Sequence, residues 1–173
     1  MTESDADFAF SFLRDEQVAY ARTPAPPQHF NQARSWVTQS LASPTVVPWI
    51  LEDELGVGAG FISLQNFDPV MGVTEVGFLV IASARRRGLA TAALRAVTEW
   101  TFANQPIHRM YLVHDVTNTA SCRAALTANY PIEGTCRSAR PGPDGTRLDC
   151  ELHAITRADV EKHHKSMLTG DTH

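Results

Sequence analysis

The sequence lacks any apolar run that approaches the roughly 20 residues of a membrane-spanning helix, so a membrane partner is not expected. Residues 1–5 lack the basic and apolar regions of a signal peptide, which favours a cytoplasmic protein. The chain also lacks an excess of positive charge, because its net charge is -4. Proteins that coat nucleic acid are usually strongly basic, and we therefore expect no nucleic-acid partner.

Cysteine is scarce, and its few positions are scattered. Cys122, Cys136 and Cys150 are odd in number, widely spaced and form no Cys-x-x-Cys pair. This argues against a disulfide framework and against a zinc site, so we expect reduced thiols that mostly pack inside the protein. The histidines, among them the isolated His153, show no His-x-x-x-His or other recognisable ligand spacing. The sequence therefore predicts no metal.

The remaining composition is typical of a globular domain. The chain has 173 residues, of which 43% are hydrophobic and 20% charged, enough to bury the core of one domain. No repeat or linker interrupts it, and residues 165–173 are polar and predict a frayed tail. We therefore expect a single domain over residues 1–173.

One short stretch concentrates positive charge. Residues 85–90 read Arg-Arg-Arg-Gly-Leu-Ala and lie between a strand-like run, residues 76–81, and a helix-like run. A glycine at a helix start lets backbone N–H groups approach a ligand, and the helix dipole with the flanking guanidinium groups favours an anion there. The spacing matches neither a nucleotide P-loop nor the Gly-x-Gly-x-x-Gly of a dinucleotide fold. It predicts a site for a diphosphate.

The stretch also has a family resemblance. Its pattern Arg-x-x-Gly-x-Ala, with Glu-Val-Gly-Phe at 75–78 before it and Asn-Thr-Ala-Ser at 118–121 after it, resembles the coenzyme A pyrophosphate loop of the GCN5-related N-acetyltransferases (GNAT), in their ribosomal-protein branch. The resemblance implies acetyl-CoA as cosubstrate and an α/β fold, with a mixed, mostly antiparallel central sheet and helices on both faces. Family members usually begin with a strand, but residues 1–6 are short and polar and offer no convincing one.

Hydrophobic periodicity predicts the elements around this loop. Strands are expected at residues 46–52, 58–65, 73–82, 109–113, 132–139 and 146–154, and helices at residues 7–21, 30–41, 89–104 and 118–128. Thr156 and Asp159 have the spacing of a cap for one last helix.

Cofactor-binding residues are carried over from the family position by position. The resemblance implies that the pantetheine arm is bound like an added strand by the backbone of Phe78, Leu79, Val80 and Ile81. It assigns the diphosphate to Arg85, Arg86, Arg87, Gly88, Leu89, Ala90 and Thr91, with Arg86 directed to solvent. It places Asn118 on the pantetheine arm and Ser121 near the sulfur. The plainer alternatives are a solvated basic turn, a buried core strand, and a helix cap at Asn118.

Two residues are expected to move protons. Glu75 precedes the loop, in the strand whose end should reach the acetyl group, and its carboxylate could take a proton from the substrate ammonium. The alternative is a solvated strand carboxylate. Ser121 could give a proton to the departing thiolate, and His114 with Asp115 forms a second candidate base. Family members commonly use a tyrosine as the general acid, but the helix expected at residues 118–128 contains none. The nearest candidates are Tyr111 and Tyr130.

The acceptor is a primary amine, on a small molecule or a protein N-terminus, if the resemblance holds. Its identity is not readable, because the first helices and hairpins that would bind it match the family least. The oligomeric state stays open; a homodimer is the candidate form, because dimers are common among relatives. Two rivals stay open: a noncatalytic module that binds an acyl-CoA or a protein partner, and a loop that binds RNA phosphate, which the net charge disfavours.

Overall fold

The computed structural model describes residues 1–14, 27–142 and 145–162. The backbone separates into two compact units, Met1–Phe67 with Gly77–Ala93 and Asp68–Val76 with Leu94–His173. The expectation of a single domain stays a prediction, and the polar tail at 165–173 lies outside the part that the structure describes.

The first unit begins with helices and continues into a hairpin. Its elements are a short 3-10 helix η1 (Glu3–Asp5), α1 (Ala6–Leu13), α3 (Phe30–Ala42), β1 (Val47–Glu52), β2 (Gly58–Asp68) and a second 3-10 helix η2 (Ala82–Ala84). Helical spacing places Phe12 of α1 and Val37 of α3 in a core with Phe61 of β2. The Phe12 ring stacks on the Phe61 ring, with centroids 5.9 Å apart. Aromatic packing therefore holds both helices on the hairpin.

The hairpin turn and one close backbone contact depend on particular residues. The Asp53 carboxylate accepts hydrogen bonds from the N–H groups of Leu55 and Val57, at 3.0 and 3.1 Å, and closes the turn between β1 and β2. At Gly60 of β2, an added Cβ would lie 2.2 Å from the Leu79 carbonyl oxygen. Only glycine permits this approach of the two backbones.

The second unit holds the larger share of strands. Its elements are the start of β3 (Val73–Val80), most of α4 (Leu89–Asn104), β4 (Arg109–Asp115), α5 (Thr119–Thr127), β5 (Ile132–Pro141) and β6 (Arg147–Thr156). Residues 157–162 are helical, and Thr156 donates its N–H and hydroxyl to the Asp159 carboxylate at 2.9 and 2.6 Å. The expected cap of a last helix is therefore confirmed.

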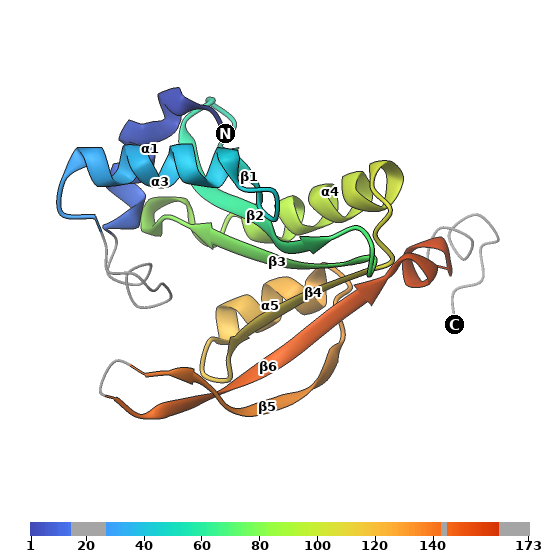
Figure 1. The fold of residues 1–173 in the computed structure, drawn as a ribbon. Helices are drawn as coiled ribbons and strands as arrows, with labels where there is room; N and C mark the ends of the chain where they lie inside the picture. Colours follow the sequence, from blue (N-terminus) through green and yellow to red (C-terminus); the bar gives the residue numbers. More distant parts are fainter. Residues whose placement is uncertain (15–26, 143–144, 163–173) are drawn as a thin grey trace. The chain divides into compact units, whose positions relative to one another are not determined.

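The strands form one six-stranded sheet in the order β1-β2-β3-β4-β6-β5 (Figure 1). The β1–β2, β4–β6 and β5–β6 pairs are antiparallel, whereas β3 and β4 run parallel. Helices flank this sheet. The expected mixed, mostly antiparallel α/β class is confirmed, and residues 1–14 contain no strand, as their composition indicated.

A half-buried arginine directly after β6 binds the end of α4. The Arg157 guanidinium donates to the carbonyls of Phe102, Gln105 and Ile107, the last two at 2.9 and 2.7 Å. Carbonyls at a helix C-terminus have no partner within the helix and carry partial negative charge, so a cation there is favourable. These three contacts link residues 50 to 55 positions apart in the chain.

Some expectations need correction or fall outside the described chain. The first helix was expected to reach residue 21, but α1 ends at Leu13 and residues 15–26 are not described. All three cysteines are free, as expected, and Cys150 is buried. Cys136 is exposed on β5 and is the exception to the expectation that the thiols mostly pack inside the protein. In the parts of the chain with described structure, no helix is long and apolar enough to cross a membrane.

Candidate functional site

The loop after β3 takes its shape from two residues with left-handed backbone. Arg86 has a φ of +65° and Gly88 a φ of +78°. Helix α4 starts at Leu89, and the Gly88 carbonyl accepts a helical hydrogen bond from Ala92 at 3.0 Å. The first N–H groups of a helix have no acceptor within the helix. Gly88 is exposed, with no protein atom within 4 Å of the place a Cβ would take, so the loop backbone is open to a ligand.

The three arginines of the loop have different surroundings. Arg85 is half-buried and donates from Nε to the Val80 carbonyl at 2.9 Å, which fixes the loop to the end of β3. Arg86 is exposed, as expected. The Arg87 side chain is 45% exposed and its Nη1 lies 3.5 Å from Asp53 Oδ2. Two exposed arginines, Arg86 and Arg87, thus directly precede Gly88.

Asp53 keeps its charge beside this loop. Hydrogen bonds from the backbone of Val57 and Leu55, and then the Arg87 guanidinium, hold the pKa of the Asp53 carboxyl below its ordinary value. An exposed ion pair of this length contributes little to stability. Arg87 can therefore exchange this carboxylate for a bound anion at low cost.

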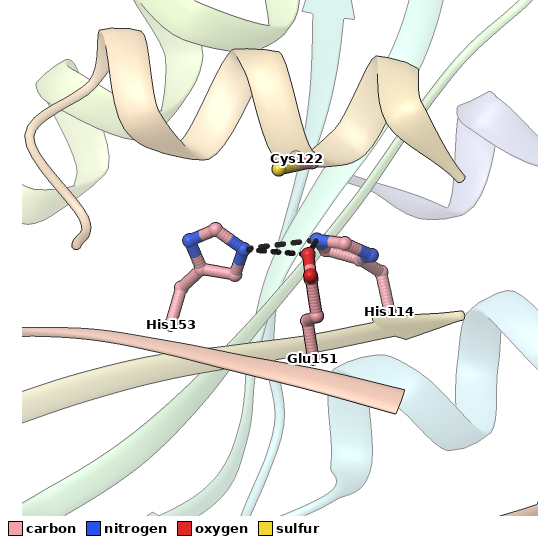
Figure 2. A group of neighbouring side chains, drawn as sticks. All are labelled: His114, Cys122, Glu151 and His153. Atoms are coloured by element: carbon pink, nitrogen blue, oxygen red, sulfur yellow. Dashed lines mark hydrogen bonds and ion pairs between the residues drawn. The ribbon is translucent and has the colours of Figure 1, made fainter. Parts of the chain in front are cut away.

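Four side chains of the types that bind metal ions lie close together in the second unit. His114 of β4, Cys122 of α5, and Glu151 and His153 of β6 point toward one another, and their ligand atoms all lie within 4.8 Å (Figure 2). The strand register explains three of them, because His114 lies opposite Glu151 and His153 follows two residues later on the same face. His114 and His153 are buried, with 5% and 0% of their surface exposed.

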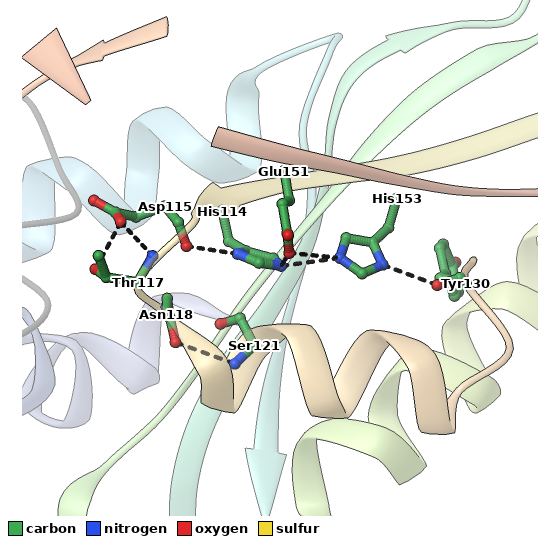
Figure 3. A network of polar contacts seen from close by, with 8 residues as sticks. All are labelled: His114, Asp115, Thr117, Asn118, Ser121, Tyr130, Glu151 and His153. Carbon is green, nitrogen blue, oxygen red and sulfur yellow. Dashed lines mark hydrogen bonds and ion pairs between the residues drawn. The ribbon is translucent and has the colours of Figure 1, made fainter. Parts of the chain in front are cut away.

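The two imidazole rings of this cluster are held by backbone carbonyls. His114 Nδ1 donates to the Asp115 carbonyl at 2.8 Å, and His153 Nδ1 donates to the Tyr130 carbonyl at 2.9 Å (Figure 3). Their Nε2 atoms are 3.0 Å apart and lie 3.6 and 3.8 Å from Glu151 Oε2. Partial burial and a hydrogen bond with Glu151 raise the pKa of the Cys122 thiol.

The chain enters α5 next to this cluster through a turn at Asp115 and a helix cap at Asn118 (Figure 3). Asn118 Oδ1 accepts from the Ser121 N–H at 3.1 Å, so Asn118 is the helix cap that the sequence offered as one alternative. Asp115 Oδ1 accepts from the N–H and the hydroxyl of Thr117, both at 2.7 Å. Ser121 is half-buried in the first turn of α5, one residue before Cys122.

Tyr130 lies in the core of the second unit. It is 0% exposed, and its hydroxyl lies 2.6 Å from Thr98 Oγ1. Burial raises the pKa of the Tyr130 phenol well above its ordinary value. This environment suits a packing residue better than a proton donor to substrate.

The residues expected at the site fall into two groups. Residues 78–81 and the arginine loop belong to the first unit, where Arg85 joins them through Val80. Glu75, Asn118 and Ser121 belong to the second unit. Glu75 is half-buried in β3 and pairs with Tyr111 across the parallel ladder, which consists of the pairs Val73–Arg109, Thr74–Met110 and Glu75–Tyr111.

Sequence reasoning missed the cluster around His114. Glu151 and His153 were not connected with Cys122, because residues 114, 122, 151 and 153 match no ligand spacing. The usable signal was the Glu-x-His alternation in the last strand, since residues two apart on a strand share a face. Its partners, however, depend on the register between β4 and β6.

Comparisons with known proteins place these features in context. Residues 1–129 match the family described as "Acetyltransferase (GNAT) domain". The solved structure of RimL, a ribosomal L7/L12 α-N-protein acetyltransferase in complex with coenzyme A, is similar at 16% identity and a TM-score of 0.83, over 92% of each chain. Comparison with the curated proteins found no match.

Two further solved structures are similar. Spermidine N-acetyltransferase from Vibrio cholerae, in complex with CoA and spermine, has 14% identity and a TM-score of 0.81 over 92% of this chain and 94% of that one. The microcin C7 self-immunity acetyltransferase MccE, with acetyl-CoA and AMP, has 17% identity and a TM-score of 0.78 over 90% and 88%. At sequence identities this low, the similarity to these three structures shows only that this chain shares their fold.

Proposed function

Because this chain belongs to the GNAT acetyltransferase family, we propose that it moves an acetyl group from acetyl-CoA to a primary amine of a small molecule or a protein N-terminus. One observation carries the proposal. Gly88 is open and left-handed at the start of α4, and two exposed arginines, Arg86 and Arg87, directly precede it. Such a backbone suits a diphosphate.

The loop binds the coenzyme A diphosphate through its backbone. The N–H groups of Leu89, Ala90 and Thr91 at the start of α4 donate to the phosphate oxygens, and Arg87 adds charge-assisted contacts. Arg85 positions the loop, because its guanidinium holds the Val80 carbonyl. RimL, MccE and the spermidine enzyme were solved with coenzyme A or acetyl-CoA, which supports this cosubstrate.

The pantetheine arm lies along the end of β3. The β3–β4 ladder ends at the pair Glu75–Tyr111, although β3 continues to Val80. Backbone groups of residues 78–81 can therefore pair with the amides of the arm as they would with an added strand. A role of Asn118 at the pantetheine arm rests on the family resemblance alone; in the structure its side chain caps α5.

The chemistry is direct attack in a ternary complex. Glu75 takes a proton from the substrate ammonium, and the neutral amine attacks the thioester carbonyl carbon. The new C–N bond forms, the C–S bond breaks, and the thiolate takes a proton from the Ser121 hydroxyl. The nitrogen gives up its second proton, which returns to the Ser121 oxygen through water. Alignment of two bound substrates is worth about 7–11 kcal/mol in intramolecular analogues, so proton transfer need supply only part of the acceleration.

The acceptor bears an amine, and the chain's own charge favours a cationic one. Its net charge is -4, which raises the local concentration of a polyamine or a free α-amine over a neutral acceptor. The similar structures include proteins named for spermidine and for a ribosomal-protein N-terminus. Both kinds of amine therefore belong in the first screen.

The test has two stages with the full chain. Titration calorimetry with coenzyme A and acetyl-CoA should give binding with one ligand per chain. A thiol-release assay with acetyl-CoA should then give turnover with at least one member of a panel of polyamines, amino acids and short peptides with free N-termini. Calorimetric binding without thiol release across the panel would favour the noncatalytic module instead. Absence of binding, together with salt-dependent retention of RNA, would refute the proposal.

A further inference from the structure

The buried side chains of His114 and His153 face each other through their Nε2 atoms. Each donates its Nδ1 proton to a backbone carbonyl, which can only accept. In the neutral form both Nε2 atoms are then acceptors, and they lie 3.0 Å apart. Two lone pairs at this distance repel each other, so the arrangement requires a positive centre between the rings.

We propose that this centre is a zinc ion held by His114, Cys122, Glu151 and His153. The carboxylate supplies negative charge, since Glu151 Oε2 lies 3.6 and 3.8 Å from the two Nε2 atoms. The Cys122 sulfur completes the set from the opposite side, as Figure 2 shows. The four ligand atoms, two nitrogens, an oxygen and a sulfur, all lie within 4.8 Å of one another.

The distances fit tetrahedral zinc after small side-chain movements. Bonds of about 2.0–2.3 Å to nitrogen, oxygen and sulfur imply ligand-to-ligand separations of about 3.3–3.6 Å. The observed separations run from 3.0 Å between the imidazoles to an upper limit of 4.8 Å within the set. To close the shell, the two imidazole nitrogens must move slightly apart, and the more distant ligand atoms of the set must move closer.

The surroundings match those of a transition-metal site. A histidine that binds a metal through one nitrogen usually donates the other N–H to a carbonyl or carboxylate, which fixes the tautomer and the ring. His114 and His153 both have this arrangement. Sulfur and imidazole ligands favour zinc over magnesium or calcium, which prefer oxygen.

Zinc would fasten α5 to β4 and β6. Cys122 is the ligand from α5, and it follows Ser121 directly. The inference does not depend on acetyl transfer, because its readouts are metal binding and thermal stability. A failed amine screen would leave it standing.

The test uses the full chain after removal of metals with a chelator. Addition of Zn²⁺ should give one tightly bound ion per chain by elemental analysis and raise the melting temperature, and Co²⁺ should give thiolate-to-metal charge-transfer absorption. Cys122→Ser should abolish that absorption and weaken zinc binding at least about 10- to 100-fold, the loss that even outer partners of a metal ligand cause.

Cys136→Ser is the matched control, because Cys136 is an exposed thiol outside the cluster and should leave absorption and affinity unchanged. Glu151→Gln is a second variant that keeps shape and should also weaken zinc binding. Equal behaviour of the two cysteine variants would overturn the ligand set. Absence of a bound ion in the parent chain would overturn the site and leave a proton as the positive centre.

Discussion

The hydroxyl groups of Thr98 and Tyr130 form a hydrogen bond in the core of the second unit. Thr98 Oγ1 lies 2.6 Å from both the Leu94 carbonyl and the Tyr130 hydroxyl. The carbonyl can only accept, so the Thr98 proton goes to Leu94 and Tyr130 donates to Thr98. The two substitutions that break this contact therefore leave different groups behind.

Thr98→Val leaves the buried Tyr130 hydroxyl with only the Met110 sulfur at 3.9 Å, a weak acceptor. A buried donor without a partner costs about 1–3 kcal/mol, whereas Tyr130→Phe removes the donor and costs about 0.5–1.5 kcal/mol. The double variant, Thr98→Val with Tyr130→Phe, leaves no buried hydroxyl without a hydrogen-bond partner. We expect it to be more stable than Thr98→Val alone by about 1 kcal/mol, or about 2–4 °C in melting temperature for a chain of this length.

The assay is thermal or urea unfolding of the four proteins, which forms a double-mutant cycle. The result that refutes the reasoning is a double variant less stable than Thr98→Val, with the two losses simply added. Turnover gives an independent check. Tyr130→Phe should keep the acetyl transfer rate of the parent at temperatures where both are folded, and a large loss there would make Tyr130 a proton donor after all.

Three further predictions concern the site and the helix ends. Ser121→Ala should slow thiol release by about 10²–10⁴-fold, the usual contribution of a general acid, with unchanged calorimetric affinity for coenzyme A; unchanged turnover would return Ser121 to the first turn of α5 alone. Hydrogen bonds from Thr156 lower the pKa of Asp159, so the stability lost in Asp159→Asn should be constant above about pH 5 and shrink as pH falls below about 4; a difference that grows in acid would contradict this. Arg157→Lys cannot reproduce the fork across three carbonyls and should cost about 1.5–3 kcal/mol in urea unfolding, and an unchanged midpoint would show that the α4 terminus needs no such cap.

Local sequence signals predicted the elements well, because their causes are local. The spacing of apolar residues placed α4 at Leu89–Asn104, and Asn118 marked the start of α5 with the hydrogen bond expected of a cap. The sequence also placed Gly88 at the start of α4, where the structure gives it a positive φ that glycine adopts without steric cost. The roles of Glu75 and Ser121 in catalysis stay predictions.

Long-range features escaped prediction for a physical reason. The His114 cluster exists because β4 and β6 pair in a register that sets His114 opposite Glu151, and the sequence of either strand alone does not contain that register. The contact of Arg157 with the α4 carbonyls and the approach of Gly60 to Leu79 are of the same kind. Each depends on where two distant segments meet.

The most direct test of the central claim is the coenzyme A affinity of Gly88→Ala against that of Gly145→Ala. Both glycines have left-handed φ, +78° and +81°, with open space where a Cβ would stand, so alanine strains both backbones equally. The strain of about 1–2 kcal/mol should weaken calorimetric binding about 5- to 30-fold only at Gly88, because only that loop must hold its shape for the diphosphate. Equal affinities in the two variants and the parent would contradict the assignment of this loop to coenzyme A.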